Sequence, residues 1–196
     1  MNQPGMMEAR LSQEEVKGVY NNLARIYNSW GALTESRARE RGIQLAQVKD
    51  GENILDVAVG TGLILADIVK INPTGFNAGI DISSGMLKKA YARFLNTPAK
   101  VELKQATAFE IPYSDGFFDL VINGYMFDLM PVEVMPKILA EFRRVLKPEG
   151  RLVLINMTEG ERPGSQVYQR IYQLNPALMG GCRGVKMVGQ LTEVGF

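Results

Sequence analysis

A buried strand that ends in a glycine-containing turn is the feature that most constrains this chain. Apolar, partly β-branched residues occupy positions 54–59 around Asp56, and the run stops at Gly60-Thr61-Gly62. A helix-period pattern begins directly after this turn. Because glycine has no Cβ, the backbone at such a strand-to-helix turn can come close to a ligand. The pattern therefore predicts a βα unit that binds a ligand at its turn.

Asp81 lies in a second strand-like run, 76–82, one helix later in the sequence. An acid about 20 residues after the glycines is typical of a nucleoside-binding βαβ unit, because its carboxylate accepts hydrogen bonds from ribose hydroxyls. A dinucleotide fingerprint needs a further glycine at its sixth position, where the two reading frames have Leu63 and Leu65. The sequence therefore predicts a nucleoside ligand. It disfavours a pyrophosphate, and with it a nicotinamide-dependent oxidoreductase.

The composition of the 196 residues excludes several classes of function. A net charge of +1 gives no basic field for nucleic acid, and we expect none as a partner. The chain has no histidine and a single cysteine, Cys182, so we expect no metal site, no internal disulfide and no Ser-His-Asp triad. No apolar run approaches the ~18 residues of a membrane span, and the N-terminus lacks a signal-peptide pattern. We therefore expect a cytoplasmic chain, with peripheral membrane contact left open.

Short apolar runs alternate with helix-period segments, which predicts an α/β fold with a doubly wound, mostly parallel sheet. We expect strands at 53–59, 76–82, 100–105, 117–123 and 150–156, and helices at 62–71, 84–95 and 132–146. Two earlier helices are expected, one opened by a capping box at 12–15 and one at about 34–47. Polar residues follow or end the strands, namely Asp56, Asp81, Thr107, Asn123 and Asn156. In open α/β sheets this edge is where ligands bind.

Five segments in order resemble the class I S-adenosylmethionine-dependent methyltransferases, a likeness that extends over roughly residues 16–196. They are Leu-Asp-Val-Ala-Val-Gly-Thr-Gly at 55–62, Ile-Asp-Ile-Ser at 80–83, Ile-Pro-Tyr at 111–113, Phe-Asp-Leu-Val at 118–121 and Arg-Val-Leu-Lys-Pro-Glu-Gly at 144–150. Each is weak alone, but five at compatible spacing are specific. The pattern around Val16, Tyr20, Leu23 and Tyr27, with Ala58 in the turn, resembles the ubiquinone/menaquinone-biosynthesis branch.

The resemblance implies a Rossmann-like fold that binds S-adenosylmethionine. The glycine turn would pass under the methionine and ribose, Asp81 would accept from both ribose hydroxyls, and Asp56 could orient an amino group or a water. Ile82 and Met86 would flank the adenine, and Ala108 would offer its backbone N–H to the adenine ring. Asn123 and Tyr125 would lie beside the methionine end, and Tyr27 could close over the ligand from the N-terminal helices. The implied cofactor-binding set is Tyr27, Asp56, Ala58, Gly60, Thr61, Gly62, Asp81, Ile82, Met86, Thr107, Ala108, Asn123 and Tyr125.

Two positions depart from the family pattern. Ala58 stands where the family usually has its first glycine, and we expect it to be tolerated only with a negative φ. Thr107 stands where many members have an aspartate for the adenine amino group. Its hydroxyl can still accept that hydrogen bond, but without the help of a charge.

The methyl acceptor implied by the resemblance is a small or lipid-like molecule, with quinol C- or O-methylation favoured. A phosphatidylethanolamine-type N-methyltransferase is one alternative, and a non-catalytic nucleoside-binding protein on the same fold is another. Methyl transfer from a sulfonium needs alignment and exclusion of water more than it needs an acid. Asp128, Tyr125 and Glu159 are candidates for a base, although we expect Asp128 to be only an exposed loop residue.

The predicted organisation is one domain, with an N-terminal helical lid region at 1–50 and a methyltransferase domain at 51–196. In the resembling family, a segment like the Leu-Thr-Glu-Val-Gly-Phe at 191–196 precedes two further strands. We therefore expect a sheet that lacks its last two strands and has an apolar edge at the fifth. Either the chain is shortened, or a second copy covers this edge in a homodimer.

Overall fold

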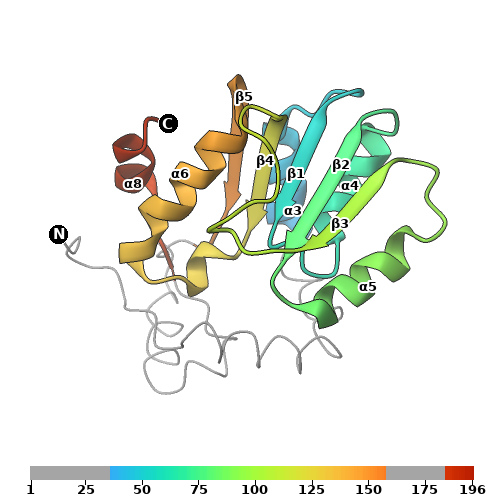
Figure 1. Cartoon of the computed structure of the whole chain (residues 1–196), viewed down its shortest axis with the longest axis horizontal. Helices are drawn as coiled ribbons and strands as arrows, with labels where there is room; N and C mark the ends of the chain where they lie inside the picture. Colours follow the sequence, from blue (N-terminus) through green and yellow to red (C-terminus); the bar gives the residue numbers. More distant parts are fainter. Residues whose placement is uncertain (1–35, 158–183) are drawn as a thin grey trace.

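The alternating pattern forms one five-stranded sheet in the order β3-β2-β1-β4-β5 (Figure 1). The strands are β1 Asn53–Val57, β2 Phe76–Asp81, β3 Val101–Gln105, β4 Phe118–Gly124 and β5 Leu146–Ile155. The structure is a computed structural model that describes residues 36–157 and 184–196. All pairings between these strands are parallel, which confirms the doubly wound fold. The described residues do not include the expected helix that the capping box at 12–15 would open, nor Tyr27, Glu159 and Cys182.

Helices cover both faces of this sheet (Figure 1). They are α3 Ser36–Ala46, α4 Leu63–Ile71, α5 Ser84–Phe94, α6 Met135–Val145 and α8 Val188–Glu193. The first three pack on one face, and α6, with α8 against it, packs on the other. Because both faces are covered, β1, β2 and β4 are buried along most of their length. The edge strand β3 instead alternates apolar with polar residues.

The side chains of β1 show how the two layers share one strand. Ile54 packs in the cluster that contains Ala46 of α3 and Ile68 of α4. Leu55 and Val57 point to the opposite face and join the cluster built around α6. All three are buried, and β1 is the middle strand of the sheet.

Two expected boundaries differ from the structure by more than two residues. The strand expected at 150–156 begins at Leu146, because Leu146 already pairs with Phe118 before the register shifts to pair Leu120 with Arg151. The helix expected at 132–146 is preceded by a 3₁₀ turn, Val132–Val134, and becomes α-helical at Met135. Within 36–157 and 184–196, no helix has the length and apolar character needed to cross a bilayer.

Candidate functional site

The turn between β1 and α4 has three left-handed residues at alternate positions. Ala58, Gly60 and Gly62 have φ values of 57°, 55° and 81°. A Cβ added to Gly62 would lie 2.9 Å from the Phe94 ring, so α5 packs closely against the turn from outside. Arg93, also on α5, donates from Nε to the carbonyl oxygen of Thr61 at 2.9 Å. The backbone of the turn is therefore held in place before any ligand arrives.

The expectation that Ala58 keeps a negative φ is wrong. Its φ of 57° is the conformation that the family's glycine would adopt freely, and in which an L-residue with a Cβ is strained by about 1–2 kcal/mol. Val59, the next residue, donates its N–H to Ile80 O at 2.9 Å and ties the turn to β2. The residues next to Ala58 thus fix its backbone in the left-handed conformation, although this conformation is strained for alanine.

Asp81 is poised at the end of β2 with both carboxylate oxygens hydrogen bonded. Oδ2 accepts from the Gly60 N–H and Oδ1 from the Ser83 N–H, each at 2.8 Å. Each oxygen retains a further lone pair, so the carboxylate can still accept from two hydroxyls. Ser83 caps α5 by accepting from the Met86 N–H at 3.2 Å. Asp81 is therefore left available for a diol.

Asp56 is a buried acid whose two carboxylate oxygens have no hydrogen-bond partner. Burial raises its pKa well above the usual range, and the nearby charge of Asp81 adds to the rise. The partial positive charge of the Leu65 N–H, which does not meet hydrogen-bond geometry with the carboxylate, offsets part of this rise. Because an unpaired buried carboxylate is costly, this arrangement favours a bound group that donates hydrogen bonds or carries positive charge.

Asn123 lies at the end of β4, next to β1. Its Nδ2 donates to Val57 O at 2.7 Å, which fixes the orientation of the amide, and its Oδ1 is buried without a partner. Tyr125 follows with a φ of 60°, an uncommon conformation for a bulky residue, and donates its N–H to Ile155 O at 2.7 Å. Residues with a strained backbone often lie at functional sites. Tyr125 was expected at the site, but no feature of the sequence indicated its left-handed backbone.

The expectation that Asp128 is an exposed loop residue is wrong. The side chain is fully buried, and both of its oxygens accept from the Met157 N–H, at 3.2 and 3.0 Å. This contact links the 3₁₀ turn after β4, Phe127–Leu129, to the end of β5. Asp128 therefore has a structural role, and a role as a base remains a prediction.

The residues expected near an adenine lie after β2 and β3. Ile82 is 41% exposed, whereas Met86 is buried. Thr107 already accepts through Oγ1 from the Phe109 N–H at 3.3 Å and forms an isolated bridge with Glu110, so residues 107–110 form a tight turn. The hydroxyl keeps a second lone pair for a ligand.

The carboxyl ends of β1, β2 and β4 thus bring together the glycine turn, an available carboxylate and a buried unpaired acid. This set fits S-adenosylmethionine, which has a ribose diol for Asp81 and an ammonium group for Asp56. Within the part of the chain that the structure describes, no group of histidine, cysteine or acidic residues is arranged to hold a metal ion.

Comparison with known proteins agrees with this geometry. A family model for a methyltransferase domain matches residues 54–150. A demethylmenaquinone methyltransferase from Symbiobacterium thermophilum is 31% identical over 161 residues, which are 79% of this chain and 62% of that protein. One from Listeria monocytogenes is 31% identical over 170 residues, covering 82% of this chain and 70% of that protein. The chain therefore spans between three fifths and three quarters of the length of these two relatives.

A solved structure shows the same fold. The crystal structure of an S-adenosylmethionine-dependent methyltransferase from Aquifex aeolicus superposes with a TM-score of 0.61 at 23% identity. The match covers 83% of this chain and 88% of that protein.

Proposed function

The chain belongs to the family of class I S-adenosylmethionine-dependent methyltransferases, and from this membership we propose that it methylates a quinol-type acceptor. S-adenosylmethionine is the methyl donor of the family. The choice of acceptor is supported by the two demethylmenaquinone methyltransferases, which match about four fifths of this chain.

The observation that carries the proposal is the pair of acids at the ends of β1 and β2. Asp81, with one backbone N–H on each oxygen, would hold the ribose diol, and Asp56 would accept from the methionine ammonium. Charge-assisted hydrogen bonds of this kind are stronger than neutral ones. The left-handed backbone at Gly60 and Gly62 would leave room for the ligand above the turn.

When bound, S-adenosylmethionine supplies a methyl group activated by a sulfonium. The chain's own residues would align the acceptor with that methyl and keep water away. Tyr125 follows β4, and its backbone N–H is hydrogen bonded to Ile155 O at the end of β5. Its ring would lie beside the methyl donor. An aromatic face stabilises a nearby cation by roughly 0.5–2 kcal/mol. A base that removes the quinol proton remains a proposal among Tyr125, Asp128 and Glu159.

Two measurements test this function. Calorimetry with S-adenosylhomocysteine should show saturable binding to the full chain, and NAD should not bind, because the turn lacks the third glycine of a dinucleotide site. An assay of methyl transfer to a demethylated naphthoquinol, phosphatidylethanolamine and small amine metabolites then identifies the acceptor. Transfer to phosphatidylethanolamine alone would contradict the quinol proposal, and binding without transfer to any acceptor would favour a non-catalytic protein.

A further inference from the structure

The segment between β3 and β4 is fastened to the sheet at its beginning. The Ala106 N–H donates to Asp81 O at 3.1 Å, directly beside the carboxylate expected to hold the ribose. The tight turn at 107–110 comes next, and its backbone carries the N–H of Ala108 that the family resemblance directs at the adenine. The position of this turn therefore depends on how the rest of the segment is held.

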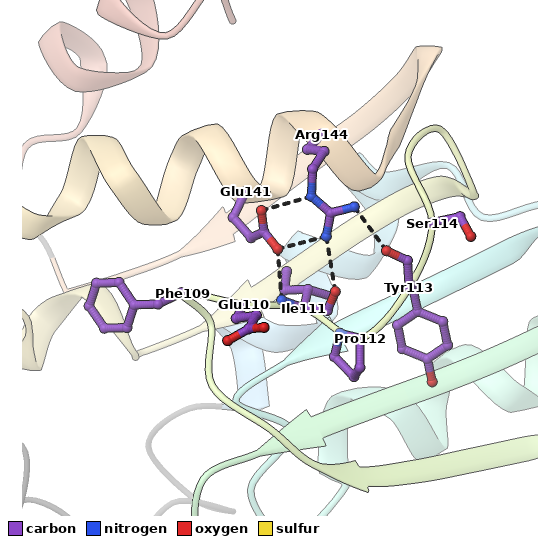
Figure 2. Close-up of a pocket in the computed structure, with 8 residues that line it drawn as sticks. All are labelled: Phe109, Glu110, Ile111, Pro112, Tyr113, Ser114, Glu141 and Arg144. Carbon is purple, nitrogen blue, oxygen red and sulfur yellow. Dashed lines mark hydrogen bonds and ion pairs between the residues drawn. The ribbon is translucent and has the colours of Figure 1, made fainter.

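Arg144, at the end of α6, holds the other end of the segment with all five of its N–H donors. Figure 2 shows the contacts to Glu141, Ile111 and Tyr113. Its Nη1 donates to Tyr113 O at 2.9 Å and to Asp115 at 2.6 Å, and its Nη2 to Ile111 O at 2.9 Å. The remaining donors form a two-pronged contact with Glu141, at 2.8 Å from Nε and 2.6 Å from Nη2. Two backbone carbonyls and two acids are thereby gathered around one planar group.

Glu141 lies on the same helix and also holds the segment, so we call the pair Glu141 and Arg144 the clasp. Its Oε1 accepts from the Ile111 N–H at 2.7 Å, so the polar backbone groups of Ile111 are both held by α6 (Figure 2). The Arg144 hydrogen bonds keep the pKa of Glu141 below its usual value, so the acid is charged at neutral pH. The Gly116 N–H, in turn, donates to Arg144 O at 2.9 Å.

This clasp forms part of the wall of an open pocket of about 700 Å³, together with residues 109–114 (Figure 2). Arg144 has no donor left for a ligand, because each one is used within the chain. Its role is therefore to fix the shape of the segment and not to bind a molecule in the pocket. The turn at 107–110 lies between two anchors, Asp81 at one end and the Glu141–Arg144 pair at the other.

We propose that Glu141 and Arg144 are positioning residues for an adenine subsite formed by Thr107 and the backbone of Ala108. The assignment rests on the proposed function, which puts the adenine at this turn. A lysine cannot replace Arg144, since a single ammonium cannot reproduce the planar fork that reaches two carbonyls and a carboxylate together. With one anchor lost, the turn would no longer present its hydrogen-bonding groups in a fixed arrangement.

The test compares two ligands that differ only in the base. S-adenosylhomocysteine has an amino group at the adenine 6-position, and S-inosylhomocysteine has an oxygen there, so the ratio of their dissociation constants reports on recognition of the base. We expect Arg144→Lys to weaken binding of S-adenosylhomocysteine about tenfold, or about 1.4 kcal/mol, and to reduce the ratio toward one. Glu141→Gln should act in the same direction by a smaller factor, and it keeps the test open if Arg144→Lys does not fold.

Arg143→Lys is the matched control, because Arg143 is the neighbouring arginine on α6 and lies over the Phe196 ring, away from the segment. It should leave both affinities unchanged. A ratio that stays at the wild-type value in Arg144→Lys and Glu141→Gln would overturn the assignment, even if the melting temperature falls, because a purely structural role lowers stability without changing the preference for the base. Failure of the wild-type chain to bind S-adenosylhomocysteine would instead refute the proposed function.

Discussion

Replacing Asp56 with asparagine should stabilise the chain while weakening its hold on the ligand. The carboxylate is 1% exposed and neither of its oxygens has a hydrogen-bond partner. A buried ion of this kind has an effective desolvation penalty of several kcal/mol. An unsatisfied neutral amide in its place costs about 1–3 kcal/mol. The difference predicts a net gain on the order of 1–2 kcal/mol at pH 8, or roughly 2–8 °C in Tm for a chain of this size.

The pH dependence gives the sign of the effect. Burial and the charge of Asp81 raise the folded-state pKa of Asp56 above the unfolded value of about 3.9. At pH values between the unfolded and the folded pKa, Asp56 is therefore protonated in the folded state and ionised in the unfolded state. The contribution of Asp56 to stability is largest below about pH 4 and declines by at most about 1.4 kcal/mol per pH unit as the pH rises toward the folded pKa. Asp56→Asn removes this decline, so its advantage over the wild type should shrink toward pH 4.

Thermal and urea unfolding between pH 4 and pH 8, without ligand, measure this advantage. Glu149→Gln is the control, because it removes the same charge from an exposed site. Calorimetry with S-adenosylhomocysteine should show the opposite sign, a loss of about 10- to 100-fold in affinity, since a hydrogen bond to a charged group contributes about 1.5–3 kcal/mol. A variant with the wild-type pH profile, or one less stable than the wild type at pH 8, would refute the argument from burial.

Three further changes test the same site. Ala58→Gly should raise stability by about 0.5–1 kcal/mol in urea unfolding, because relief of the left-handed strain exceeds the added freedom of the unfolded chain, and a loss of stability would contradict the strain at φ 57°. Gly62→Ala should destabilise the chain by at least about 1 kcal/mol more than Gly51→Ala. Both glycines have a positive φ, but only a Cβ at Gly62 would contact Phe94. Equal losses of stability would show that Phe94 moves aside without cost. Asp81→Asn should weaken binding of S-adenosylhomocysteine by about 10- to 100-fold, and unchanged affinity would remove this carboxylate from the ribose site.

The centre of the sheet could be predicted because β1, β2 and β4 are covered on both faces. Continuous apolar runs such as the one at 54–59 are then the signature of a buried strand, and their alternation with helical periods fixes the parallel connections. The first residues of β5 were not predicted as strand, because their sequence is typical of a turn. The pairing of Leu146 with Phe118 precedes an irregular stretch that contains a proline and a glycine, which read locally as a turn.

The sequence was enough to find the polar residues of the candidate site at strand ends. It was not enough to predict the burial of Asp128 or the backbone conformation of Ala58. The burial of Asp128 depends on the backbone of Met157, which is distant in sequence and is brought close only by the pairing of β4 with β5. The left-handed backbone at Ala58 follows from its neighbours and runs against the preference of alanine itself. The clasp at Arg144 joins side chains to loop carbonyls, and no local pattern encodes such contacts.

The strand order also sets when the two sides of the candidate site can form as the chain folds. β1 precedes the turn, yet one of its neighbours is β4, and Asn123 reaches Val57 across a separation of 66 residues. Pairings this distant form slowly, because a long loop must close before the contacts stabilise it. The half of the sheet made of β1, β2 and β3 is local in sequence and can assemble earlier. We therefore expect the β4 side of the candidate site, with Asn123 and Tyr125, to form after the turn and Asp81 are in place, when β4 docks beside β1.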